Sequence, residues 1–399
     1  MSSSRGQFLY GIVEDVEDYF VTDYDIIDRY IGDSLWNWGL NNNQQLGSNI
    51  TDSNRLTPNT ISVGGTNWKS VSCGFNFAAA VKLDGTLWTW GDNTSGQLGV
   101  NDTVNRSTPV TTFAGGTNWK SVSCGLEHVI ATKTDGTLWT WGLNASGQLG
   151  DNTTTRRSTP VTTFAGGTDW NFPSAGKYHS SAIKLDGTLW VWGYNFYGGL
   201  GVNDTAIRST PVTTFAGGTD WKSVSCGTEH TVAIDIEGTL WTWGRNTSGQ
   251  LGVNDTTDRS TPVTTLSGVT PWRALSNIKN SEHTVAIKSD GTLWVWGKNT
   301  SGQLGVNDTT NRSTPVTTFA GGNDWKVATT GSTHTVAIKS DGNLWSWGSN
   351  AFGQLGDNTT VGKSTPVTTI TGETDWKSVS CGNDFTTAIR SGYNIDVDF

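Results

Sequence analysis

Residues 87–99 read Leu87-Trp88-Thr89-Trp90-Gly91-Asp92-Asn93-Thr94-Ser95-Gly96-Gln97-Leu98-Gly99, and this stretch decides the fold because it recurs at a fixed interval. The Trp-x-Trp-Gly core occurs seven times, 51 to 53 residues apart, beginning at Trp36, Trp88, Trp139, Trp190, Trp241, Trp294 and Trp345. All 21 tryptophans follow this pattern, because each unit adds one more, at Trp68, Trp119, Trp170, Trp221, Trp272, Trp325 or Trp376. A repeat whose units need their neighbours to bury an apolar face predicts one repetitive architecture for the chain.

Each unit contains the pattern of a β-hairpin. In one unit, the alternating runs 230–235 and 239–244 flank Glu237-Gly238, and Asp-Gly holds this place in most other units. We expect a two-residue turn here, with both residues at positive φ. That turn would place Trp241 opposite Ile234 and His230 opposite Arg245, so that Trp, Val, Ile and His share one face and small residues the other. Sheets stacked large face against small face predict a propeller.

The two ends of the repeat region complete each other. The last unit supplies runs 376–381 and 385–390 but has no Trp-x-Trp-Gly, whereas the first unit begins with that core and lacks the strand before it. We therefore predict an all-β, seven-bladed β-propeller over residues 34–399, closed by N- and C-terminal strands. Residues 1–33 stand outside the repeat as a short N-terminal arm.

Composition narrows the functional class. The net charge is −9, and no basic stripe of the kind typical of nucleic-acid binders is present. No apolar run is long enough to span a membrane, and residues 1–6 lack the apolar core of a secretory signal. The cysteines share one repeat position, which favours small buried thiols over a disulfide or a metal site. They are Cys73, Cys124, Cys226 and Cys381.

The sequence contains no recognisable catalytic motif, so we expect neither an enzyme nor a cofactor. The histidines hold one repeat position, which Phe77 and Phe385 occupy in the remaining units, and they are His128, His179, His230, His283 and His334. Equivalent atoms on stacked sheets lie about 10 Å apart, whereas zinc–nitrogen bonds are about 2.0–2.1 Å long. We therefore interpret the histidines as packing residues and expect no metal.

The Gly-x-x-His strand, the Asp-Gly turn, the Trp-x-Trp-Gly strand and the Asn-x-x-Gly-Gln-Leu-Gly segment together resemble the regulator of chromosome condensation family of repeats. The resemblance covers residues 34–393 and implies a seven-bladed propeller of four-stranded blades. The family's founding member is a nucleotide exchange factor for the GTPase Ran and binds chromatin. This chain lacks a basic tail and a long inserted wedge, which argues against that role. The units are also similar to repeat proteins of bacterial and viral genomes, and to a bacterial β-lactamase inhibitor that grips its target with one propeller face.

Two groups of residues are candidate contact sites. The arm has two interpretations: it is either a docking segment that becomes ordered on a larger assembly, or a solvated arm or edge strand. The candidate docking residues are Tyr19, Phe20, Tyr24, Ile26, Ile27 and Tyr30. One unit departs from the repeat at Lys177, Tyr178, Tyr194, Phe196 and Tyr197. These residue types are typical of a partner-binding patch, and the alternative is sequence drift without function. The same turn would set His179 opposite Tyr194 and Lys177 near Phe196. An insertion at residues 277–280 is either a second contact loop or a tolerated loop change.

The sequence favours a non-enzymatic structural or binding protein, associated with a virion as a capsid or tail surface component. In this hypothesis the arm docks on other subunits of the particle, and the propeller is displayed or contacts a host surface. The alternative is a cytoplasmic regulator of a partner protein, such as a guanine nucleotide exchange factor or an enzyme inhibitor, that uses one propeller face. Neither hypothesis involves nucleic acid or membrane insertion.

Overall fold

The computed structural model describes residues 29–49, 53–61, 64–266, 268, 270–278 and 281–395. The chain divides into two compact units, one made of residues 32–392 and one made of residues 1–31 with 393–399. In the described part of the smaller unit, β1 (Arg29–Ile31) pairs antiparallel with β31 (Tyr393–Ile395), and Tyr30 lies opposite Asn394. The backbone of Tyr30 is therefore in a strand, whereas the other five candidate docking residues lie outside the described residues.

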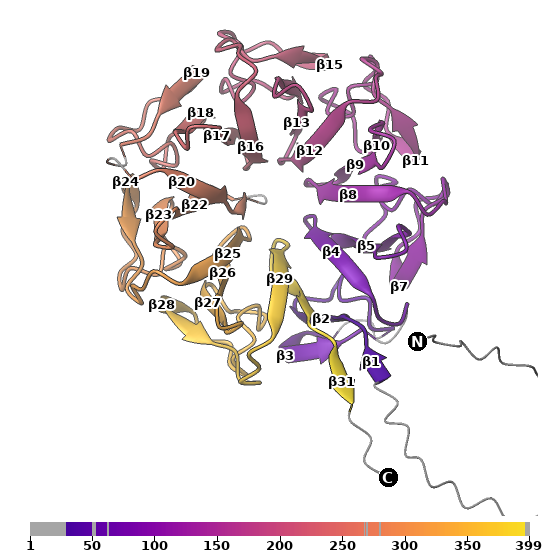
Figure 1. Cartoon of the computed structure of the whole chain (residues 1–399), viewed down its shortest axis with the longest axis vertical. Coiled ribbons are helices and arrows are strands. Elements are labelled where there is room, and N and C mark those ends of the chain that lie inside the picture. The colour runs from indigo at the N-terminus through magenta and orange to yellow at the C-terminus, as the bar shows by residue number, and fades with distance from the viewer. Residues whose placement is uncertain are drawn as a thin grey trace, which may run out of the picture. The chain divides into compact units, whose positions relative to one another are not determined.

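Residues 32–392 form a closed ring of sheets, as Figure 1 shows. The innermost strands are β4 (Trp68–Cys73), β8 (Trp119–Cys124), β12 (Trp170–Ala175), β16 (Trp221–Cys226), β20 (Trp272–Leu275), β25 (Trp325–Thr330) and β29 (Trp376–Cys381). The second strands are β5 (Phe77–Lys82), β9 (His128–Lys133), β13 (His179–Lys184), β17 (His230–Asp235), β22 (His283–Lys288), β26 (His334–Lys339) and β30 (Phe385–Arg390). The third strands are β2 (Ser34–Gly39), β6 (Leu87–Gly91), β10 (Leu138–Gly142), β14 (Leu189–Gly193), β18 (Leu240–Gly244), β23 (Leu293–Gly297) and β27 (Leu344–Gly348). The outer strands are β3 (Arg55–Thr60), β7 (Arg106–Thr111), β11 (Arg157–Thr162), β15 (Arg208–Thr213), β19 (Arg259–Thr264), β24 (Arg312–Thr317) and β28 (Lys363–Thr368).

The predicted closure of the ring is confirmed. One blade has the order β29-β30-β2-β3, so it combines strands from the two ends of the repeat region. Trp38 on β2 donates from Nε1 to the main-chain oxygen of Gln354 at 2.9 Å, across the seam. Asp33 accepts hydrogen bonds from Lys377 Nζ at 2.7 Å and from the main-chain N–H of Gly392 at 2.9 Å. Side-chain and main-chain contacts thus fasten the two ends together.

The predicted hairpin register is wrong by one residue. Trp241 lies opposite Ala233 and His230 lies opposite Gly244, whereas the two-residue turn would have paired Trp241 with Ile234 and His230 with Arg245. The connection is a three-residue loop, residues 236–238, in which Asp235 O accepts from the N–H of Gly238 and only Gly238 has a positive φ, of 85°. A type I turn followed by a left-handed glycine adds one residue to the loop and moves the whole pairing.

This shift redistributes the side chains between the two faces of a blade. Trp241 shares its face with the small side chain of Ala233, while Val232 and Ile234 point to the other face. The tryptophans of the next blade, Trp272 and Trp296, form one buried cluster with Val232, Ile234 and Leu240. Indoles therefore pack against the branched aliphatic face of the neighbouring blade, and not against a face of small residues as the sequence had indicated.

The innermost strands are also joined around the ring. The N–H of Cys226 donates to Oγ of Ser174 on the preceding blade at 3.0 Å, and Ile278 uses its N–H in the same way toward Ser225 at 2.9 Å. Ile278, in β21 (Asn277–Ile278), thus occupies the cysteine position of its unit and is fully buried. All four cysteine side chains are buried, and burial raises the pKa of the Cys381 thiol well above its usual range. The expected burial of the thiols is confirmed, but the position is not limited to small side chains, because Ile278 fills it in one unit.

Candidate functional site

The loops between the first and second strands of the blades converge near the axis of the ring at one end of the propeller, a place here called the channel mouth. A pocket of about 150 Å³ at this mouth is lined by Phe75, Leu126, Lys177, Thr228, Glu282, Lys298 and Ser332. Five of these residues directly follow the glycine that comes after the first strand of their unit. Because equivalent positions converge here, any departure from the repeat changes the chemistry of one shared surface.

The five residues of the predicted patch lie together. The rings of Tyr178 and Tyr194 meet edge to face with centroids 6.0 Å apart, and Phe196 stacks on Tyr194 at 6.4 Å. Tyr197 packs edge-on against Phe196 at 5.1 Å, and Nζ of Lys177 lies 5.2 Å from the Tyr178 centroid. Phe196 is 65% exposed, so the row presents an open aromatic surface. The predicted opposition of His179 and Tyr194 is wrong, because Tyr194 N–H bonds to Tyr178 O.

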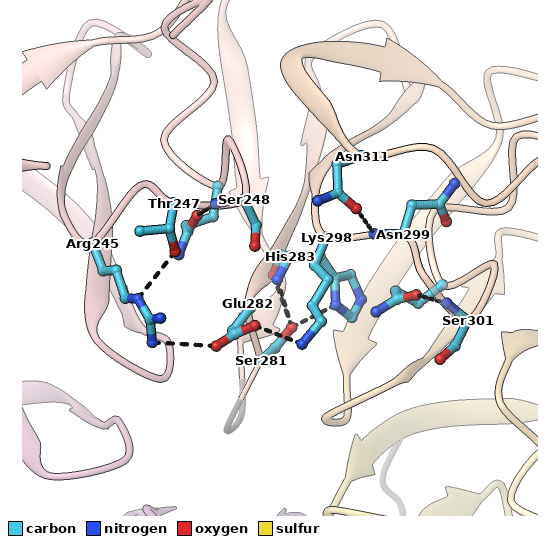
Figure 2. A network of polar contacts seen from close by, with 12 residues as sticks. Arg245, Thr247, Ser248, Ser281, Glu282, His283, Lys298, Asn299, Ser301 and Asn311 are labelled. Atoms are coloured by element: carbon cyan, nitrogen blue, oxygen red, sulfur yellow. Dashed lines mark hydrogen bonds and ion pairs between the residues drawn. The ribbon is translucent and has the colours of Figure 1, made fainter. Parts of the chain in front are cut away.

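An ion network that the sequence reasoning missed continues this row. The Arg245 guanidinium lies 5.1 Å from the Tyr197 centroid and forms ion pairs with Glu229 at 2.8 Å and Glu282 at 3.4 Å. Lys298 Nζ lies 2.8 Å from the other carboxylate oxygen of Glu282. Figure 2 shows Glu282 between the two cations, which belong to different blades. We call the nine residues of the row and the network the channel-mouth face: Lys177, Tyr178, Tyr194, Phe196, Tyr197, Glu229, Arg245, Glu282 and Lys298.

The register of the strands explains why these residues meet. The residue before each histidine bonds, through its main-chain oxygen, to the N–H of the residue after Trp-x-Trp-Gly. This places Tyr178 beside Tyr194, Glu229 beside Arg245 and Glu282 beside Lys298. The complementary side chains of these three pairs could have indicated the register from the sequence. The predicted two-residue turn, however, placed each of these residues opposite a different partner.

The electrostatics of the face keep its phenols protonated. Burial, followed by the negative charge of Glu127 and Glu229, raises the pKa of Tyr178 above its usual value. Burial and Glu229 likewise raise the pKa of Tyr194. Both hydroxyls therefore remain neutral donors at physiological pH. Aromatic rings with hydroxyl tips, next to arginine and paired charges, are the groups that dominate binding energy in protein interfaces.

The histidines of the repeat pack between neighbouring blades. His179 and His230 are buried, and Nε2 of each contacts a threonine hydroxyl of the next blade, at 2.9 and 3.1 Å. Among the described residues, no group of three or more His, Cys, Asp or Glu side chains is placed to hold a metal ion. Within the same part of the chain, no helix has the length and apolar character needed to cross a membrane.

Two comparisons with known sequences identify relatives over most of the chain. The model described as an RCC1-like domain matches residues 31–280, and that of the regulator of chromosome condensation (RCC1) repeat matches residues 290–338 and 341–389. The ultraviolet-B receptor UVR8 of Arabidopsis thaliana is 33% identical over 351 residues, which cover 84% of this chain and 77% of that protein. The mitochondrial RCC1 domain-containing protein RUG3 of the same plant is 28% identical, covering 81% of this chain and 79% of that protein.

Solved structures of the same architecture superpose closely. Human WBSCR16 gives a TM-score of 0.78 at 20% identity and covers 90% of this chain and 99% of that one. Yeast RCC1 (Prp20), in its structure with Kap60, gives 0.79 at 18% identity and covers 97% of each chain. At these identities the likeness supports the fold alone.

Proposed function

Because this chain belongs to the regulator of chromosome condensation repeat family, we propose that it is a non-enzymatic protein-binding regulator that holds a partner protein against its channel-mouth face. The observation that carries the proposal is the continuity of that face: an aromatic row passes, through Tyr197 and Arg245, into an ion network. A single surface thus offers both large apolar area and directional charge. Those are the components of an interface core and its rim.

Solved structures of a yeast neighbour agree with a protein-binding role. One describes Kap60 bound to yeast RCC1, and another describes the binding of yeast Prp20p to Gsp1p and histones. These statements concern the yeast protein, and they support the use of such a propeller as a binding scaffold. The relatives named above come from plants, humans and yeast, so the virion-component hypothesis draws no support from them.

The proposal is tested by affinity capture with the full-length chain. The variant Tyr194→Ala/Phe196→Ala/Tyr197→Ala removes the centre of the row. The control is Phe164→Ala/Phe215→Ala, which removes two rings from other loops with exposed fractions of 66% and 64%, close to the 65% of Phe196. A partner captured by the wild type and by the control is expected to bind the triple variant at least about tenfold more weakly, equivalent to about 1.4 kcal/mol. Equal capture by the triple variant would refute the assignment of this face.

A narrower version of the proposal is guanine nucleotide exchange. A relative named as a homologue of the X-linked retinitis pigmentosa GTPase regulator, from Caenorhabditis elegans, is 26% identical over 75% of this chain and 24% of that protein. The direct measurement is release of a fluorescent nucleotide from purified small GTPases of the Ran class. If the wild-type chain accelerates nucleotide release and the triple variant does not, the result supports exchange. If the wild-type chain does not accelerate release, the function is binding without exchange.

A further inference from the structure

A cation covers the paired tryptophans of almost every blade. Lysine Nζ lies 4.0–5.3 Å from the ring centroids of the first-strand tryptophan and the first tryptophan of the Trp-x-Trp-Gly strand in five blades. Arg390 holds the same place over Trp36, at 5.5 Å. The lysines are Lys82, Lys133, Lys184, Lys288 and Lys339. The repeat thus places a cation over its indoles six times, and in five of these blades a lysine lies over two indole rings.

In three of these blades a carboxylate completes the site. Asp169 pairs with Lys184 at 3.2 Å, and Asp324 pairs with Lys339 at 3.1 Å. Asp375 pairs with Arg390 at 2.6 Å. Each of these aspartates directly precedes the first-strand tryptophan of its unit. A cation held between indole rings and this carboxylate is therefore a recurrent feature of the fold.

The blade of β16–β19 keeps the site but lacks the cation. Trp221 and Trp241 are present with ring centroids 6.1 Å apart, and Asp220 directly precedes Trp221 as in the three blades above. The residue in the lysine position is Asp235. Among the described residues, no ion pair involves Asp220 or Asp235. The blade therefore presents two carboxylates and two indoles where its neighbours hold an ammonium group.

The space left by the missing lysine is open. A pocket of about 170 Å³ is lined by Asp220, Trp221, Asp235, Trp241 and residues 216–218. Trp221 is 7% exposed, whereas its counterparts in the other blades are at most 2% exposed. The Asp235 carboxylate is fixed at the pocket, because it accepts hydrogen bonds from Trp241 Nε1 at 3.0 Å and from the N–H of Thr239 at 2.8 Å.

We propose that this pocket binds an alkylammonium group, as carried by a lysine side chain of a partner protein or by a small quaternary amine. The ammonium takes the position that Lys184 and Lys339 occupy in their own blades, over both indole faces and within ion-pair reach of Asp220. Asp235 supplies a second negative charge where the sister blades supply the tethered cation. This pocket shares no residue with the channel-mouth face, so the two proposals stand or fall separately.

The test follows the indole N–H resonances of the full-length chain, labelled with ¹⁵N-tryptophan and assigned with Trp221→Phe and Trp241→Phe. The probe is Nα-acetyl-lysine N-methylamide, and its norleucine analogue controls for shape without charge. Saturable shifts of the Trp221 and Trp241 signals are expected with the lysine probe, with affinity at least tenfold above that of the norleucine analogue. No saturable shift, or equal affinity for the two probes, would overturn the proposal.

Variants separate a ligand site from a structural role of Asp235. Asp235→Lys restores the residue type of the sister blades, and its tethered ammonium is expected to abolish the shifts. Asp220→Asn leaves the turn untouched and is expected to weaken binding at least threefold. Lys184→Asp is the gain-of-function control: it empties the site beside Asp169, so the Trp170 and Trp190 signals are expected to become responsive. Undiminished binding by folded Asp235→Lys and by Asp220→Asn would show that Asp235 serves only the turn.

A third probe distinguishes the source of the ammonium group. Choline offers a quaternary head without a peptide backbone. Tighter binding of the blocked lysine supports a protein-borne ligand, and tighter binding of choline supports a small-molecule ligand. Either result supports the site, provided that the norleucine analogue binds more weakly than both.

Discussion

The Nε2 atom of His230 lies 3.1 Å from Oγ1 of Thr284 on the next blade, and both side chains are fully buried. The Thr284 hydroxyl donates to the main-chain oxygen of Gln250 at 2.9 Å, so the imidazole Nε2–H is the donor in the first contact. Where the histidine position holds Phe77, the threonine position of the next blade holds Val129. The polar pair is thus replaced as a unit by an apolar pair.

Changing one member of this pair is expected to cost more stability than changing both. Thr284→Val leaves the buried Nε2–H of His230 without an acceptor, which costs about 1–3 kcal/mol. His230→Phe/Thr284→Val copies the Phe77–Val129 arrangement and is expected to cost less than the sum of the single changes, by about 1 kcal/mol. Denaturant unfolding of the wild type, His230→Phe, Thr284→Val and the double variant measures the coupling free energy between the two residues. Strict additivity would mean that the two residues contribute independently.

Stability is expected to fall as the pH drops below about 6.5. Burial lowers the pKa of His179 to about 4, and burial lowers those of His230, His283 and His334 to about 3. Between pH 6.5 and 4 these histidines are protonated in the unfolded chain but not in the folded chain. Each histidine therefore lowers the unfolding free energy by up to about 1.4 kcal/mol for every pH unit of acidification. Above pH 6.5 this contribution is fully present.

The measurement is the unfolding free energy at several pH values between 4.5 and 7.5. The slope of the unfolding free energy against pH reports the number of protons taken up on unfolding. His230→Phe is expected to reduce this number by up to one, whereas the control Phe77→Leu lowers stability without changing the slope. Aspartates whose pKa is lowered in the folded state, such as Asp84, have unfolded values near 3.8 and act mainly below this window. A slope that His230→Phe does not alter would contradict the assignment.

Gly244→Ala is expected to destabilise the propeller by more than about 3 kcal/mol. Gly244 has a φ of 101°, and an added methyl group would lie 2.5 Å from the main-chain oxygen of Glu229 and 2.7 Å from Cα of His230. Both contacts are with the backbone of the paired strand, which cannot move without breaking the ladder. Gly115→Ala is the control, because Gly115 also has a positive φ, 55°, but no atom lies within 4 Å of the added carbon. Thermal unfolding compares the two variants, and equal losses would point to backbone strain alone.

Glu282→Gln is expected to change stability by less than about 1 kcal/mol, although Glu282 joins two blades. Its side chain is 24% exposed, and Arg245 keeps its pair with Glu229 at 2.8 Å. Partly exposed ion pairs contribute little because solvent screens them and both side chains lose freedom. Unfolding at low and high salt measures the effect, with Glu237→Gln as the control in an exposed turn. A loss above about 2 kcal/mol would show that the network holds the blades together.

The membership of the candidate site was largely predictable from the sequence. Tyr178, Tyr194, Phe196 and Tyr197 stood out because they interrupt an otherwise regular repeat, and they do lie together. Arg245 and Glu282 were not predicted, because they join different blades across 37 residues of chain. Asp235 was read as the end of a strand. Its significance depends on the lysines that cover the indoles elsewhere, and that arrangement is visible only in three dimensions.

The amino-acid sequence alone implies the number of blades, the order of their strands and the closure of the ring, because a fixed period and two complementary ends admit one circular arrangement. It also determined that histidine and cysteine positions are buried, since Phe and Ala replace them. Which residues face each other is evident only in the folded chain. Periodicity shows that a strand alternates, but whether a turn contains two or three residues depends on the φ of its first residue, and that choice moves every side chain of the return strand to the opposite face.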